Sequence, residues 1–327
     1  MNAIEQARAS VTTASLTPDQ LCAGKCVRNA SVTTASLTPD QLAFYHEHGY
    51  LRIPAVFTSD ETRTLKSDLD WMIRDWANIG VGWTGPWRQR LMSIEDEAKS
   101  KLIAMHDLQY YSDNWMKAVT KPNLAHMMSQ LLAGADEPDG APVELHHSTM
   151  HVKPPETGQP FPMHQDLAFY DHQDGRYVDV LVHLDDTSHE NGEIRFMDGS
   201  HKLGPLHHIR SFVNASGEKE ECTPHLPWEQ FRLEDTVPVP AKAGDIVIFN
   251  IYTIHGSHMN QTNQMRRLVR IGYKHPQNRQ VKGQSSNRPN LMVKGKRERI
   301  DGQVLYSTEC HGFADIQGEA STFGIKL

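Results

Sequence analysis

The segment PFPMHQDLAFY, residues 160–170, carries the pattern around which the rest of the chain can be interpreted. It holds a histidine and a carboxylate two residues apart, His164 and Asp166. In an extended strand alternate side chains project to the same side, so both groups can reach one metal ion. A lone His-x-Asp pattern is common by chance, so a further ligand has to come from elsewhere in the chain.

A second segment, GDIVIFNIYTIHGSHMN, residues 244–260, offers that ligand. His255 follows an apolar run typical of a strand that enters the core, and the small residues after it leave room beside a cofactor. Two histidines and one carboxylate with open coordination positions form the facial triad of non-haem iron oxygenases. The sequence therefore predicts a metal site made of His164, Asp166 and His255.

An arginine-rich string, RRLVR, begins eleven positions after His255. An oxygenase that uses 2-oxoglutarate chelates iron with one end of this keto acid and must hold the far carboxylate elsewhere. A guanidinium suits that task because its rigid fork donates two charge-assisted hydrogen bonds and stays charged when buried. On a strand, Arg266 and Arg270 share one face and Arg267 takes the other. The spacing favours Arg266 and leaves Arg267 and Arg270 as competitors.

The composition is that of a globular protein with neither a nucleic-acid-binding nor a membrane signature. A formal charge of -7 argues against wholesale binding of phosphates, which needs a basic face. No run approaches the roughly 18 apolar residues of a membrane span, and the first residues lack an apolar signal core. We expect a cytoplasmic protein that acts on a small molecule, without nucleic-acid or membrane partners. Its oligomeric state stays open, a homodimer included.

A duplication marks the N-terminus, where residues 9–21, ASVTTASLTPDQL, recur letter for letter as residues 30–42. Only the second copy continues into a foldable segment, because residues 38–41 form a capping box and a short helical pattern follows. We expect residues 1–36 to be disordered and residues 37–327 to form a single domain.

Helical patterns come first along the chain and strands follow. A second capping box at residues 58–61 opens an amphipathic helix, and residues 123–133 also have helical spacing. Short β-branched stretches follow, namely HHSTMHVKPP, RYVDVLVHLDDT, EIRFM, DIVIFNIYTI and RLVRIGYKH. Residues 190–193, ENGE, are typical of a hairpin turn between two of them. This order predicts an α+β fold, with a jelly-roll or cupin-like double-stranded β-helix as its core and N-terminal helices packed around it.

Together these motifs make the chain resemble the phytanoyl-CoA dioxygenase (PhyH) family of Fe(II)/2-oxoglutarate-dependent oxygenases. The matching words are MHVKPP, HQD, ENGEIRFMDGSHK and the string from AGDIVIF through IHGS to MRR, in family order from about Leu37 to Tyr273. The resemblance implies an enzyme that holds Fe(II) with His164, Asp166 and His255. It also implies 2-oxoglutarate and O2 as cosubstrates, with ascorbate as an accessory reductant.

The same resemblance assigns residues to the cosubstrate. It implies that Arg266 holds the distal carboxylate of 2-oxoglutarate, that Ser257 contacts that carboxylate, and that Met150 lines the cosubstrate pocket. The implied reaction couples decarboxylation of 2-oxoglutarate to succinate and CO2 with oxidation of a second substrate. Asp166 argues against halogenation, because in related halogenases a small residue replaces the carboxylate ligand.

The substrate is expected to be compact and polar. Polar residues gather near the expected mouth of the barrel, namely His151, Tyr170, His172, Tyr177 and His183. A hydroxylase of a specialised biosynthetic pathway is the main hypothesis. Two alternatives stay open, an acyl-CoA 2-hydroxylase of the phytanoyl-CoA type and a non-oxidative cupin-like metal protein. The second would share the barrel and the metal ligands but would have no need of a carboxylate anchor at Arg266.

Overall fold

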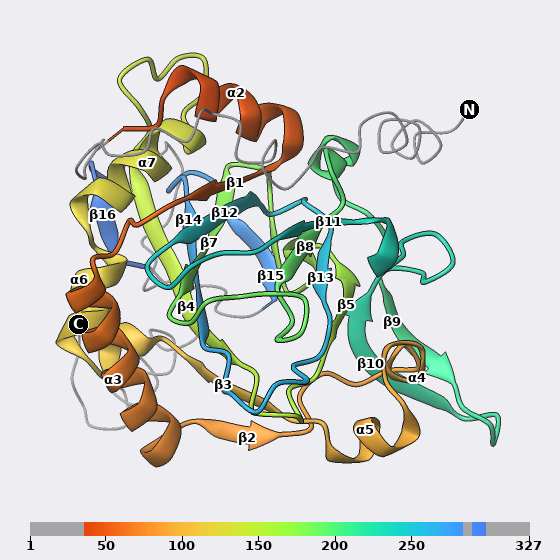
Figure 1. The fold of residues 1–327 in the computed structure, drawn as a ribbon. Coiled ribbons are helices and arrows are strands. Elements are labelled where there is room, and N and C mark those ends of the chain that lie inside the picture. The colour runs from red at the N-terminus through yellow and green to blue at the C-terminus, as the bar shows by residue number, and fades with distance from the viewer. Residues whose placement is uncertain (1–35, 284–289, 299–327) are drawn as a thin grey trace, which may run out of the picture.

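A computed structural model describes residues 36–283 and 290–298 of the chain (Figure 1). Most of its helices precede most of its strands, as the sequence predicts. The α-helices are α2 (Pro39–His48), α3 (Ser59–Asp75), α4 (Arg88–Leu91), α5 (Ile94–Lys99), α6 (Asp113–Val119) and α7 (Pro122–Leu132). Single 3-10 turns are η1 (Leu108–Tyr110), η2 (Asp166–Ala168), η3 (Ser200–Leu203) and η4 (Leu233–Asp235).

Both predicted capping boxes form. Thr38 accepts a hydrogen bond from the backbone N–H of Gln41, whose side chain accepts one from Thr38 in return, so two otherwise unpaired donors of α2 are satisfied. Thr58 and Glu61 do the same for α3. These local signals set where each helix begins.

The large antiparallel sheet carries most of the predicted strands. Its order is β1 (Tyr50–Ile53), β12 (Ile246–Asn250), β7 (Tyr177–His183), β14 (Leu268–Lys274), β4 (Val143–Val152), β3 (Leu102–His106) and β2 (Asn78–Gly80), with β16 (Met292–Lys294) also paired to β4. Strands β2, β3 and β4 are neighbours both in sequence and in the sheet, whereas β1, β12, β7, β14 and β4 each pair with strands far away in the sequence. This crossing over is what a jelly roll requires.

Helices α2, α3, α6 and α7 cover the outer face of the large sheet, whereas α4 and α5 lie away from it (Figure 1). In β7, Val178, Val180 and Val182 point to this face and join the main core with apolar side chains of α3, α6 and α7. The alternate residues Asp179 and Leu181 of β7 point the other way, because successive strand residues face opposite sides. The carboxyl side chain of β7, Asp179, therefore faces the inner side of the sheet.

A smaller antiparallel sheet faces that inner side and closes the barrel (Figure 1). Its order is β11 (Val237–Val239), β8 (Ile194–Phe196), β13 (His255–Ser257) and β5 (Phe161–His164). A second core cluster joins the sheets, with Phe196 of β8 packed against Phe249 of β12. The remaining strands form two short ribbons, β9 (Ile209–Val213) with β10 (Lys219–His225) and β6 (Tyr170–His172) with β15 (Gln280–Gly283).

The predicted hairpin at residues 190–193 is wrong. The strand before it, β7, belongs to the large sheet, whereas β8 after it pairs with β11 and β13 in the smaller one. The turn therefore carries the chain from one sheet to the other. Gly192 has φ 77°, and a Cβ there would lie 2.3 Å from the carbonyl oxygen of His258, so the tight crossing requires glycine.

The expectation of disorder for residues 1–36 falls, except for Ser36, outside the described residues. Within the described ranges, no helix has both the length and the apolar character needed to cross a membrane.

Candidate active site

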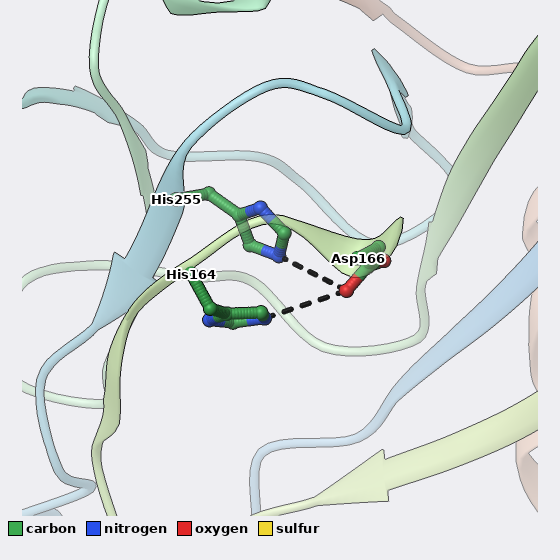
Figure 2. Close-up of side chains that lie close together, drawn as sticks. All are labelled: His164, Asp166 and His255. Atoms are coloured by element: carbon green, nitrogen blue, oxygen red, sulfur yellow. Dashed lines mark ion pairs between the residues drawn. The ribbon is translucent and has the colours of Figure 1, made fainter. Parts of the chain in front are cut away.

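Three predicted metal ligands converge between the two sheets (Figure 2). His164 ends β5 and His255 begins β13, and the two are direct cross-strand partners in the smaller sheet. Asp166 opens η2, immediately after β5. All three side chains are buried, and one donor atom from each lies within 4.8 Å of the others. The structure thus brings together the three residues that the sequence predicted as metal ligands.

Hydrogen bonds turn the same ring nitrogen of each histidine away from the cluster. His164 Nδ1 lies 2.7 Å from the carbonyl oxygen of Pro162, and His255 Nδ1 lies 3.0 Å from that of Thr253. A carbonyl only accepts, so Nδ1 carries the proton and Nε2 keeps its lone pair. The two Nε2 atoms lie 3.4 Å (His164) and 3.7 Å (His255) from Oδ1 of Asp166.

The lone pairs of the two Nε2 atoms therefore face Asp166 Oδ1, which is also an acceptor. Asp166 Oδ1 is buried and has no hydrogen-bond partner among the described residues. Burial lowers the pKa of His255 to about 3, so the ring stays neutral and cannot supply a proton to the carboxylate. Three unprotonated donor atoms around one buried point form a site for a cation, and two nitrogens with one oxygen suit divalent iron. The residues present therefore fit the metal that the motif implies.

The second oxygen of Asp166 is held by a residue whose role the sequence left open. Arg270 of β14 donates from Nη1 to Asp166 Oδ2 across 2.6 Å. Burial alone would raise the pKa of Asp166, but Arg270, His255 and His164 together outweigh it and hold that pKa well below its usual value. The carboxylate of Asp166 is therefore ionised. Its Oδ2 is bound by Arg270, and its Oδ1 remains available to a metal ion.

The three arginines of RRLVR divide as the strand alternation predicts. Arg267 faces outward and bonds to Asp70 and Asp185, so it is excluded as a site residue. Arg266 and Arg270 both line the inner cavity. With Arg270 paired to Asp166, Arg266 alone of the three keeps a guanidinium without an ion-pair partner in the part of the chain that is described.

Arg266 is buried, and burial lowers its pKa to about 10. Its Nε atom has no hydrogen-bond partner within the described ranges. A buried cation without a counter-charge is costly, so an anionic ligand would be strongly favoured beside it. Ser257 lines the same cavity, as predicted.

Arg266 and Ser257 form an anion pocket, and Lys153 is a neighbour of it whose role the sequence did not indicate. Its backbone pairs with that of Arg266 in both directions at 3.0 Å, which places the two side chains on one face. Lys153 Nζ lies 2.7 Å from Ser257 Oγ and also contacts the carbonyl oxygen of His258. Burial and the nearby charge of Arg266 lower the pKa of Lys153 well below its usual value. An N–H donated from Lys153 Nζ to Ser257 Oγ would turn the hydroxyl proton of Ser257 toward the cavity.

The cavity is partly open to solvent, and its empty space, open solvent included, amounts to about 420 Å³. The metal ligands, the anion pocket and Arg270 all line it, together with Trp83, His151, Phe161, Leu181, Gly192, Ile194, Phe249 and Leu268. One compartment thus holds a metal-binding end and an anion-binding end. The sequence motifs that predicted them are up to about a hundred residues apart, and the two facing sheets bring them together.

Met150 does not line this cavity, so its predicted role is wrong. Met150 is buried in the main core, with its partners Met105 of β3 and Val269 of β14. Side chains alternate along β4, and the next residue, His151, reaches the cavity instead.

The other polar residues expected at the mouth are distributed differently from the prediction. Of the five, only His151 lines the cavity. Tyr170, His172 and Tyr177 form a buried ring cluster with His146, beside the site. His183 is fully buried behind the cavity, and neither of its ring nitrogens has a partner in the described structure.

Trp83 is a cavity residue that the sequence did not indicate. Its ring centre lies 4.8 Å from that of His164 and 4.7 Å from that of Phe161, so it forms an aromatic wall next to the metal-binding end. Arg88 fixes the loop by donating to the backbone oxygen of Trp83 across 2.7 Å. The loop has no periodic pattern from which this position could have been predicted.

Comparison with known proteins places these features in context. Residues 45–268 match the family described as phytanoyl-CoA dioxygenase (PhyH). The chain is 26% identical over 231 residues to a probable alpha-ketoglutarate-dependent hypophosphite dioxygenase of Stutzerimonas stutzeri, covering 70% of this chain and 76% of the relative. It is 27% identical over 248 residues to L-proline trans-4-hydroxylase of Streptomyces griseoviridis, covering 70% and 83%.

Two solved structures show the same fold. The alpha-ketoglutarate-dependent carbocyclase SnoK of nogalamycin biosynthesis superposes with a TM-score of 0.60 at 19% identity, over 82% of this chain and 98% of its own. EctD from S. alaskensis, solved with 2-oxoglutarate and 5-hydroxyectoine, gives a TM-score of 0.56 at 19% identity, over 85% and 90%. At these identities the likeness establishes the jelly-roll core.

Proposed function

The chain belongs to the phytanoyl-CoA dioxygenase family, and we propose that it oxidises a compact polar small molecule at the cavity between its two sheets. It is an Fe(II)- and 2-oxoglutarate-dependent dioxygenase. The proposal rests on one observation. The same cavity holds three metal-ligand atoms that carry no proton and the buried guanidinium of Arg266, which has no ion-pair partner in the described structure. In this proposal His164, Asp166 and His255 hold the iron.

The anion pocket gives 2-oxoglutarate its orientation. Arg266 would pair with the distal carboxylate through its guanidinium fork, and Ser257 would donate its hydroxyl proton to the same group. The keto acid then extends toward the triad, where positions are left open beside the protein ligands. Bound iron supplies the redox chemistry by which 2-oxoglutarate, O2 and a substrate C–H group become succinate, CO2 and an alcohol.

The protein's remaining task is to place the substrate and to exclude water. Trp83 and Phe161 supply apolar walls next to His164, and His151 supplies a ring that reaches the cavity. Burial lowers the pKa of His151 well below its usual value, so it acts as a neutral hydrogen-bonding group. These residues would contact the substrate.

A compact substrate fits this enclosure. The empty space of about 420 Å³, open solvent included, also has to hold the cosubstrate, which favours a small molecule over an acyl-CoA of the phytanoyl type. Named relatives include hydroxylases of L-proline and of methylphosphonate, ectoine dioxygenase and 1-deoxypentalenic acid 11-beta-hydroxylase. We place this chain with them as a hydroxylase of a specialised biosynthetic pathway.

A non-oxidative cupin-like protein is less well supported, because it gives no reason for a buried, unpaired Arg266. The proposal treats residues 37–327 as one catalytic domain of a cytoplasmic enzyme, without nucleic-acid or membrane partners. Its oligomeric state stays open, a homodimer included. Ascorbate would serve only to keep the iron reduced.

Succinate release tests the proposal. Purified protein with Fe(II), ascorbate and 2-oxoglutarate should form succinate, faster when a panel of small polar compounds contains the substrate. Asp166→Ala should abolish the signal, and Arg266→Met should raise the 2-oxoglutarate concentration required while leaving metal binding intact. Arg267→Met is the matched control, since that arginine faces outward. Wild-type protein that neither binds 2-oxoglutarate nor forms succinate would refute the proposal.

A further inference from the structure

A buried chain of hydrogen bonds leads away from the metal-binding aspartate through Arg270. Besides Asp166, Arg270 contacts His147 of β4, with Nη2 3.2 Å from His147 Nε2. His147 Nδ1 lies 2.8 Å from His146 Nδ1, and His146 Nε2 lies 2.9 Å from the side-chain oxygen of Gln280. The chain therefore runs from the site to β15 at the edge of the barrel.

The chemistry of its first member fixes the direction of every bond. A guanidinium only donates, so His147 Nε2 must accept and its proton must sit on Nδ1. That proton is donated to His146 Nδ1, which leaves the other proton of His146 on Nε2, facing an amide oxygen that only accepts. Burial lowers the pKa of both histidines well below the usual value, so both are neutral, as the chain requires.

Neighbouring residues pack around this chain of hydrogen bonds. The guanidinium of Arg270 lies 5.0 Å from the ring centre of Tyr170, and its Nε lies 3.7 Å from Asp179 Oδ1. Tyr177 places its hydroxyl 2.8 Å from His146 Nδ1. Gly272 makes room for that hydroxyl, because a Cβ there would lie 1.9 Å from it. Arg270 is thus held on several sides.

We infer that Arg270, held by His147 and His146, is a positioning residue that keeps Asp166 a one-oxygen metal ligand. Oδ2 is occupied by the guanidinium, and only Oδ1 faces the two histidine Nε2 atoms. This rests on the proposed function, since the keto acid and O2 would need the metal positions that the three protein atoms leave open. An aspartate bound through both oxygens would take one of those positions.

Metal affinity tests the inference without relying on turnover. Mn(II) titration of the full chain by calorimetry should show affinity falling roughly 10-fold or more in Arg270→Met, the usual size of effect for a residue that orients a metal ligand. Arg270→Lys retains one donor and should fall between Arg270→Met and wild type. Arg267→Met, the outward arginine on the same segment, should unfold at a lower temperature yet bind Mn(II) within about 2-fold of wild type.

A second pair of variants covers the case in which Arg270→Met does not fold. His147→Gln keeps an acceptor for Arg270, whereas His147→Leu removes it, so Mn(II) affinity should fall more in the leucine variant. His172→Gln is the control, because His172 packs against His146 but does not belong to the hydrogen-bonded chain. Equal affinities in the two His147 variants, or wild-type affinity in a folded Arg270→Met, overturn the inference. A wild type that binds Mn(II) yet forms no succinate would instead overturn the proposed function.

Discussion

At the scale of single residues, the site works by placing donors and acceptors where a ligand completes them. Asp166 Oδ1 and the guanidinium of Arg266 are buried groups of opposite charge, neither paired with the other, and both line one cavity. Leaving such groups unsatisfied is costly in a folded protein unless a ligand occupies the site. Asp166 and Arg266 would therefore lie near the two ends of bound 2-oxoglutarate.

Lys153 should strengthen 2-oxoglutarate binding through Ser257. We predict that Lys153→Met weakens 2-oxoglutarate binding roughly 10-fold, the scale of one charge-assisted hydrogen bond, and leaves Mn(II) affinity unchanged. Binding to the Mn(II)-loaded protein measured by calorimetry checks this. The control ligand is 2-oxopentanoate, which lacks the distal carboxylate. An equal loss for both ligands would show that Lys153 does not act on that carboxylate.

His183 should be replaceable. Both of its ring nitrogens are buried without a partner in the described structure, and the ring does not line the cavity. His183→Leu should therefore raise the free energy of unfolding by about 1 kcal/mol, since an unsatisfied buried polar group is removed. Urea denaturation measures this. A clear loss of stability would show that the imidazole has a structural role after all.

At the scale of the element, the pairing of β5 with β13 builds the metal site. His164 and His255 face each other across this pair, so the relative position of the two strands sets the distance between the ligands. Gly256 of β13 packs closely against the backbone of β5, because a Cβ at Gly256 would lie 2.9 Å from the backbone oxygen of Phe161. The strand pair needs the small residue.

Gly256→Val should push these strands apart. We predict an Mn(II) affinity lower by at least about 10-fold, as for other changes that misplace metal ligands. Calorimetry on folded protein, checked by circular dichroism, measures it. Gly80→Ala is the control, since a Cβ at Gly80 would meet only the side chain of Asn78 at 3.9 Å. Unchanged affinity in Gly256→Val would show that the pair tolerates the added bulk.

Strand alternation also explains which site residues could be predicted. On β14 and the residues before it, the alternation correctly grouped Arg266 with Arg270 and put Arg267 on the opposite side. Strand β4 is buried on both faces, so its sequence gives no polar and apolar alternation to show which side faces the cavity. Met150 was therefore misplaced, and His151 was the residue that faces inward.

At the scale of the whole molecule, the order of helices followed by strands was enough to predict the jelly roll. Local signals set the helix starts and the strands, and the facing sheets follow from the need to bury one side of each. Contacts made by irregular segments could not be predicted in this way. Trp83 in its loop and the partner of Arg270 depend on how distant segments meet.

Buried neutral histidines should make the metal-free protein sensitive to acid. Burial lowers the pKa of His172 to about 4 and those of His183 and His208 to about 3. The unfolded chain takes up these protons near pH 6.5. Stability should therefore fall as the pH drops below that value.

Urea denaturation between about pH 7 and pH 5 checks this expectation. Asp179 and Glu193, whose pKa values burial raises, act in the opposite direction, but they are two carboxyls against several histidines. His183→Leu should reduce the slope of stability against pH. A free energy of unfolding that stays constant or rises toward pH 5 would contradict the assignment of these rings as neutral.

The most direct test of the central claim is an anaerobic titration of 2-oxoglutarate into the Fe(II)-loaded protein, followed by visible absorption. Chelation of Fe(II) by the keto acid gives a charge-transfer band, and it needs both the triad and the anion pocket. We predict a saturable band for wild type, a band that requires much more 2-oxoglutarate in Arg266→Met, and none in Asp166→Ala. Wild-type protein that binds Fe(II) but develops no band at any 2-oxoglutarate concentration would contradict the account.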